Sequence, residues 1–195
     1  MCGSRAPPTP RASPRGRRMR ENVATSSVSD VALAAILDQL RHTHDGAPWY
    51  GTSRMRFLDG VSARDAARRP PGVAHSMWEL VLHMTSWTDE VRRRLGGAEP
   101  DSPDAGDWPA VDDVTEAAWE RAKARLAAAH AGLLVEAKRL SLADLARLVG
   151  TVRDPELGTG VTYAGLLVGL AQHDAYHTGQ LALVRRLVES ADTPR

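Results

Sequence analysis

The segment from about residue 161 to residue 189 constrains the fold most, because its apolar and histidine side chains recur every three or four residues. The members of this stripe are Leu166, Leu170, His173, His177, Leu181, Val184 and Val188. At about 100° per residue, this spacing places them on one face of an α-helix. Such a helix is stable in water when its apolar face packs against other elements. The segment therefore predicts a helix that lies against the core of a helical bundle.

Three more segments share this periodicity, and the chain contains no alternating run long enough to predict a strand. These helices are expected at about 29–44, 76–96 and 112–139. Ser76 and Glu79 have the spacing of a capping box, and Asp113 with Glu116 has the same spacing before the third helix. Aromatic residues make up only 5% of the chain, which also favours helix over strand.

We predict an all-α fold, a four-helix bundle with long connections between the first and second helices and between the third and fourth. These connections span 45–75 and about 140–160, and each has room for a short helical piece. A stretch rich in Pro, Asp and Gly at 98–110 is interpreted as the loop between the second and third helices.

A length of 195 residues suits one domain with a sizeable core. Residues 1–27 are expected to form a disordered basic tail rich in Pro, Arg and Ser, and 191–195 a flexible C-terminus. The bundle then occupies 28–190. Because a second methionine lies within the tail, the natural start could be Met1 or Met19.

The charge distribution gives no reason to expect nucleic-acid binding. The net charge is +1, but six arginines in residues 1–20 leave the rest of the chain at −5. Phosphate contacts need a basic face, which an acidic body does not offer. The chain has one cysteine, so no internal disulfide is possible, and no stretch approaches the ~20 apolar residues of a membrane span. We expect a cytoplasmic protein that does not bind membranes.

His173 and His177 are four residues apart on the expected fourth helix, so both imidazoles point the same way. That spacing suits one metal ion held at about 2.0–2.1 Å from each ring nitrogen. His83 lies beside the apolar stripe of the second helix and could aim at the same point. Three ligands would leave an open position, as in catalytic sites. Spacing alone leaves the alternative open, in which each histidine is a core residue hydrogen-bonded to its neighbours.

Three motifs carry a family resemblance: residues 46–51 (Gly-Ala-Pro-Trp-Tyr-Gly), residues 76–83 (Ser-Met-Trp-Glu-Leu-Val-Leu-His) with Trp87 one turn on, and above all residues 173–180 (His-Asp-Ala-Tyr-His-Thr-Gly-Gln). Through these motifs the chain resembles the DinB superfamily over about residues 29–190. The resemblance implies a four-helix bundle with one metal-binding histidine from the second helix and two from the last. Each of these positions holds a histidine here: His83, His173 and His177.

The resemblance also implies the identity of the metal, which would be zinc, nickel or a related divalent ion, and the reaction in which it would take part. The family includes S-transferases and isomerases that use bacillithiol, mycothiol or glutathione, metal hydrolases, and members without a known activity. We therefore expect a metal-dependent enzyme that transfers a low-molecular-weight thiol to a small-molecule substrate. A metal-dependent hydrolase and a non-catalytic, metal-stabilised stress-response or binding protein are the alternatives. The sequence leaves the oligomeric state open, and a homodimer is one alternative.

Residues 173–177 (His-Asp-Ala-Tyr-His) also resemble the protease motif H-E-x-x-H, with Asp174 in place of Glu. We discount a protease, because the chain ends eighteen residues after His177 without a third ligand at the required spacing. Asp174 lies about 60° from the centre of the stripe, so it is expected at the rim of the core.

Four further residues are candidates for the walls of a pocket at this site: His44, Trp49, Trp87 and Gln180. Each has a structural alternative, namely a helix C-terminal position for His44, core packing for the two tryptophans and an interhelical hydrogen bond for Gln180. No catalytic residue is assigned. The remaining histidines are expected on the surface or in loops: His42, His75 and His130.

Overall fold

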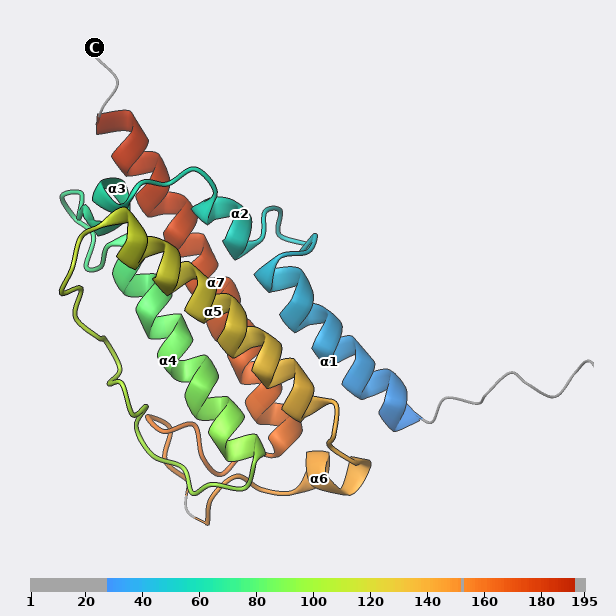
Figure 1. The fold of residues 1–195 in the computed structure, drawn as a ribbon. Helices are drawn as coiled ribbons and strands as arrows, with labels where there is room; N and C mark the ends of the chain where they lie inside the picture. The colour runs from blue at the N-terminus through green and yellow to red at the C-terminus, as the bar shows by residue number, and fades with distance from the viewer. Residues whose placement is uncertain (1–27, 152, 192–195) are drawn as a thin grey trace, which may run out of the picture.

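The computed structural model describes residues 28–151 and 153–191, and within these ranges it contains helices, one isolated bridge and no strand. Four long helices form a bundle (Figure 1): α1 (Val28–His44), α4 (Met77–Leu95), α5 (Glu116–Ala137) and α7 (Tyr163–Ala191). Three short helices lie in the connections: α2 (Arg54–Leu58), α3 (Ala63–Ala67) and α6 (Leu142–Ala146). The all-α prediction is confirmed. The expected tail, 1–27, and residues 192–195 lie outside the described residues.

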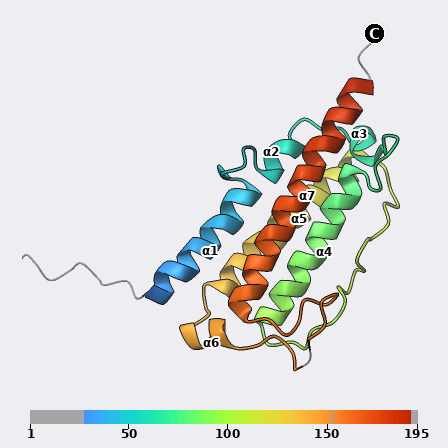
Figure 2. The same ribbon diagram turned by 180° about the vertical axis from the view of Figure 1, so that it is seen from behind.

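The long helices run in two parallel pairs. The ring centroids of Trp78 and Trp119 lie 5.0 Å apart near the start of each helix. Further along both helices Asp89 lies 3.5 Å from Arg125, so α4 and α5 point the same way. α1 and α7 run in the opposite direction to them, as the colour gradient shows in Figures 1 and 2. The order along the chain is therefore up, down, down, up.

The connection between α4 and α5 spans residues 96–115, and we call it the crossover segment. It must travel the length of the bundle, because α4 ends and α5 begins at opposite ends (Figure 1). The predicted long connections before α4 and after α5 are present, with α2 and α3 in the first and α6 in the second. The sequence interpretation of 98–110 as a simple loop missed the crossover, because composition does not reveal helix direction.

Local sequence explains where the long helices begin. Ser76 Oγ accepts a hydrogen bond from the backbone N–H of Glu79, and Glu79 accepts one from the backbone N–H of Ser76, so the predicted capping box is confirmed. The cap of α5 is Thr115, which accepts from the N–H of Ala118; the expected Asp113 instead accepts from the Thr115 hydroxyl. An N-cap side chain must directly precede the first helical turn, and Asp113 lies two residues too early.

A polar layer divides the apolar core into two clusters. One cluster gathers the start of α4 and α5 with the end of α7 and includes Trp119 and Leu126, while the other adds α1 and includes Leu40 and Leu133. Between them each long helix contributes buried polar side chains, many of them histidines. Buried polar groups cost free energy unless they are paired, so this layer is where a function is expected. Among the described residues, no helix has an apolar run long enough to pass through a bilayer.

Candidate metal centre

Three histidines from two helices meet inside the bundle. His83 comes from the middle of α4, and His173 and His177 lie one turn apart on α7. The Nε2 atom of His83 lies 2.9 Å from that of His173 and 3.1 Å from that of His177. The three ring nitrogens lie within 4.8 Å of one another. The structure therefore brings together the three side chains, which we call the triad.

A hydrogen bond on the far side of the His83 ring fixes which nitrogen carries the proton. Its Nδ1 atom lies 2.7 Å from the backbone carbonyl oxygen of Asp107. A carbonyl oxygen can only accept, so Nδ1 donates and Nε2 of the neutral ring keeps a lone pair. This lone pair lies on the side of the other two triad nitrogens.

Neighbouring side chains on α7 orient the other two rings in the same way, with each Nδ1 atom facing an oxygen. His177 Nδ1 donates to Oε1 of Gln180 at 2.6 Å, and His173 Nδ1 faces Oδ1 of the buried Asp174 at 3.6 Å. With the Nδ1 atoms turned toward oxygen, the Nε2 lone pairs face one another, which is repulsive unless a cation lies between them. Oxygen partners of this kind usually orient histidines that bind metals.

Two rings of the triad are also in the protonation state that a metal needs. Burial lowers the pKa of His83. Burial, followed by the nearby His173, lowers the pKa of His177 to about 4. Both rings are therefore neutral at pH 7, and only neutral imidazoles coordinate metal ions.

The crossover segment supports His83 from outside the bundle. Trp108 stacks on the His83 ring at 3.8 Å between centroids, and His75 stacks on the other face of Trp108 at 3.5 Å. Asp107 accepts a hydrogen bond from Trp87 Nε1 at 2.6 Å, in addition to the backbone contact with His83. Sequence reasoning missed Asp107 and Trp108; the one hint was a tryptophan within an otherwise polar, proline-rich loop.

A second polar network lies behind the triad, centred on Arg54 of α2. Its guanidinium forms an ion pair with the Asp174 carboxylate at 2.5 Å, donates to His44 Nδ1 at 2.8 Å and contacts His130 Nδ1 at 3.3 Å. His44 and His130 stack on each other with centroids 4.0 Å apart. Burial, followed by the charge of Arg54, lowers the pKa of His44 to about 2 and that of His130 to about 4. The network thus ties α1, α2, α5 and α7 together around one buried cation.

Two members of this network correct the sequence predictions. Asp174 was expected at the rim of the core but is only 1% exposed, and His130 was expected at the surface but is 4% exposed. The rim prediction was wrong because α7 contacts α1 and α2 as well as α4, so its buried arc is wider than its apolar stripe. His130 falls at helical spacing between the buried Leu126 and Leu133, a signal that the sequence does contain.

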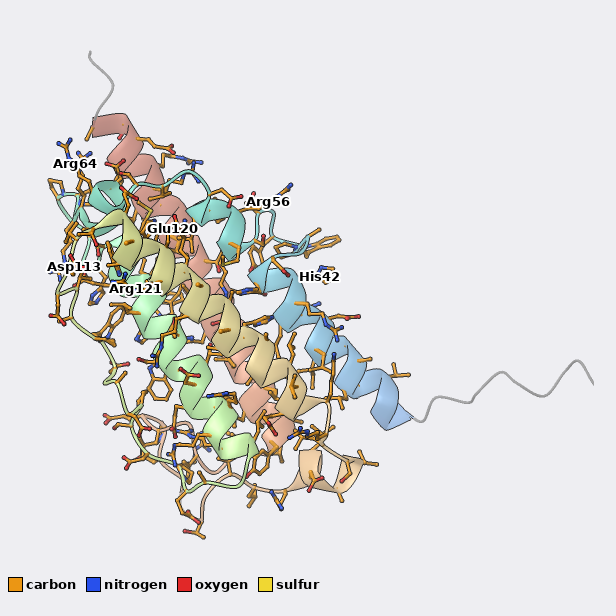
Figure 3. All side chains as sticks on the ribbon, viewed as in Figure 1. His42, Arg56, Arg64, Asp113, Glu120 and Arg121 are labelled. Atoms are coloured by element: carbon orange, nitrogen blue, oxygen red, sulfur yellow. The ribbon has the colours of Figure 1, made fainter. Side chains whose placement is uncertain are left out.

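The four expected pocket residues lie in different places. Trp87 lines a cavity beside the triad. Gln180 binds the back of His177, and His44 belongs to the Arg54 network rather than to the triad. Trp49 is fully exposed after the end of α1 and does not line this cavity, which corrects the expectation that it walls the pocket. His42 lies on the exterior at the end of α1 (Figure 3), as expected.

The cavity that Trp87 lines has a volume of about 460 Å³ and lies between α4, α7 and the loop at 155–161. His83 and His173 form part of its wall. A cavity of this size, next to a cluster of convergent polar groups, is typical of a small-molecule site.

The fold and the triad together define a helical-bundle protein with a candidate three-histidine metal centre. The chain belongs to the DinB superfamily: a family model with that description matches residues 53–181, which are more than half of the chain and include the whole triad. The fold is also similar to the crystal structure of a conserved protein from Enterococcus faecalis, with a TM-score of 0.55 and 16% identity, covering 85% of this chain and 98% of that one. Comparison with curated proteins gives no significant match.

Proposed function

We propose that the triad binds a divalent metal ion, zinc or nickel, and that the protein is an S-transferase that uses a low-molecular-weight thiol. The observation that carries the metal proposal is the set of three Nε2 atoms facing one another, with His83 Nε2 at 2.9 and 3.1 Å from the others. Imidazole nitrogens on one tetrahedral zinc ion lie about 3.3 Å apart, so His83 would move away from the other two rings by only a few tenths of an ångström. The residues fit the ion.

The number of protein ligands supports a reactive rather than a structural site. Three histidines leave one tetrahedral position open, which is typical of catalytic zinc. An ion held there lowers the pKa of a coordinated thiol and so supplies a thiolate at neutral pH. Burial keeps the His83 and His177 imidazoles neutral, and the Asp107 carbonyl and the Gln180 side chain orient them. The adjoining cavity gives the electrophile a place beside His83 and His173. Such chemistry suits the reducing cytoplasm, where we propose that the protein acts.

Two alternatives use the same triad. A hydrolase would activate water in place of the thiol, and would turn over its substrate with no thiol added. A non-catalytic protein would use the ion only to join α4 to α7, and its melting temperature would fall on chelation without any response to thiols.

The test begins with elemental analysis of the purified protein, followed by exchange of its metal for cobalt. Glutathione, bacillithiol and mycothiol are then added in turn, and the expected result is a sulfur-to-cobalt charge-transfer band with at least one of them. His177→Ala should abolish cobalt binding and the band, whereas His42→Ala, at an exposed position on α1, should keep both. Failure of the wild-type protein to bind any divalent metal refutes the metal proposal. Metal binding without a band or transfer activity refutes the transferase.

A further inference from the structure

The cavity beside the triad is a long trough with an apolar middle. On α4 it extends from His83 to Arg94, an eleven-residue step that spans about 16 Å along a helix. Val91 on one side and Leu166 and Leu170 on the other form the walls between these ends. The triad therefore lies at one end of an apolar trough rather than at the bottom of a polar cup.

Two glycines of α7 leave the floor of this trough open. Gly165 and Gly169 lie one turn apart and both line the cavity. A Cβ atom added at Gly169 would meet no atom within 4 Å outside the local helix backbone. Glycine is unfavourable in the middle of a helix by about 1 kcal/mol relative to alanine, so its presence here needs a reason other than helix stability. Space for a bound molecule supplies that reason.

The charged side chains around the trough do not favour the binding of an anion. Arg94, at the end far from the triad, donates to the Glu90 carboxylate at 2.6 Å and to the backbone oxygens of Leu157 and Asp101. Glu90 also accepts from Arg93, so the two arginines share its charge. Arg94 is nevertheless only 1% exposed, and each of its three guanidinium nitrogens already donates to a protein oxygen. The other charged side chains on the wall, apart from the histidines, are the carboxylates of Asp107 and Glu156. Among the described residues that line the trough, no cationic side chain is left without protein partners to bind an anionic group.

From these observations we infer that the trough binds the body of a neutral, elongated and largely apolar substrate, whose reactive end lies at the triad. This inference rests on the proposed function only for the role of the triad. The binding of the apolar body depends on the trough alone, so the two can be tested separately.

The test measures binding of a neutral probe, N-phenyl-1-naphthylamine, by its fluorescence, and compares it with 1-anilinonaphthalene-8-sulfonate, which has the same ring system and a negative charge. Gly169→Leu fills the trough, and Gly179→Leu is the matched control, because Gly179 lies on the same helix, is exposed, has free space at its Cβ and does not line the cavity. The same samples are loaded with zinc or with cobalt, which quenches a fluorophore bound nearby. Metal content is measured in each.

We expect the neutral probe to bind at one site, and Gly169→Leu to weaken it by about ten-fold or more while Gly179→Leu leaves it within about two-fold. The anionic probe should bind the metal-free protein at least about ten-fold more weakly, because Asp107 and Glu156 repel it and Arg94 is already bound to protein oxygens. Cobalt should quench the bound neutral probe more than zinc does. Equal binding by wild type and Gly169→Leu, or equal binding of the two probes, overturns the inference even when the metal is bound. The expected probe results without metal binding would instead refute the proposed function and leave the apolar site standing.

Discussion

Replacement of Arg54 by methionine is the sharpest test of the polar layer. Arg54 is fully buried, and its guanidinium faces Asp174, His44 and His130. Although burial raises the pKa of Asp174, the charge of Arg54 holds that pKa below its ordinary value, so the carboxylate is ionised at pH 7. Methionine fills a similar volume but leaves this carboxylate without its counter-ion.

The expected cost follows from the desolvated charge that remains. Removal of one partner from a buried ion pair typically destabilises a protein by about 3–5 kcal/mol, because the other charge stays in a low dielectric. For a domain of this size that corresponds to a fall in melting temperature of about 6–20 °C. Asp174→Asn should cost a comparable amount by leaving Arg54 unpaired. The double variant should cost about 1–3 kcal/mol less than the sum of the two, because neither charge is then stranded.

The free energy of unfolding is measured by urea denaturation at pH 7.5, with a chelator present so that metal binding does not contribute. Arg56→Met is the matched control, because Arg56 lies on the same short helix and is exposed (Figure 3). Its effect should stay within about 0.5 kcal/mol. A loss below about 1 kcal/mol for Arg54→Met, or strict additivity in the double variant, would refute the reasoning from a buried ion pair.

Three further predictions concern the histidines. Burial and Arg54 lower the pKa of His130 to about 4 and that of His44 to about 2, so below about pH 6.5 the unfolded chain takes up protons that the folded chain refuses. The metal-free protein should therefore lose about 1.4 kcal/mol of stability per pH unit and per ring as pH falls from 6.5 toward 4, and a flat profile in urea titrations would contradict this. The triad should release its metal below about pH 6, whereas full occupancy by elemental analysis near pH ~4 would argue against ligation by histidine alone. Gln180→Leu should weaken metal binding by about 10- to 100-fold in a calorimetric titration, because His177 loses its orienting partner; Gln172→Leu, at an exposed position on the same helix, should not.

The parts of this protein that sequence predicts well are those that depend on neighbours along the chain. The long helices follow from residues three and four apart, and the capping box at Ser76 and Glu79 is decided within a single turn. The pairing of His173 with His177 also depends only on local spacing, because the two residues lie one turn apart on the same helix. The meeting of His83 with that pair is not, and the expectation of it came from the family resemblance.

The parts that sequence did not predict depend on contacts between distant segments. Arg54 is one charged residue in a long connection, and only the fold reveals that Asp174, 120 positions later, is its partner. Asp107 and Trp108 belong to a loop without periodicity, and their contact with His83 depends on the direction of α5. Helix direction is set by tertiary packing, which leaves no pattern in composition or spacing.

Two helices that lie side by side and point the same way can be joined only by chain that returns along the bundle. Here that return path passes the His83 ring and places the Asp107 carbonyl against it, nine positions before α5 begins at Glu116. Loss of residues between these two points would pull the carbonyl off the ring and strain the start of α5 in the same step. The spacing from Asp107 to α5 therefore helps to set the geometry of the site, in which Trp108 of the same stretch stacks on His83.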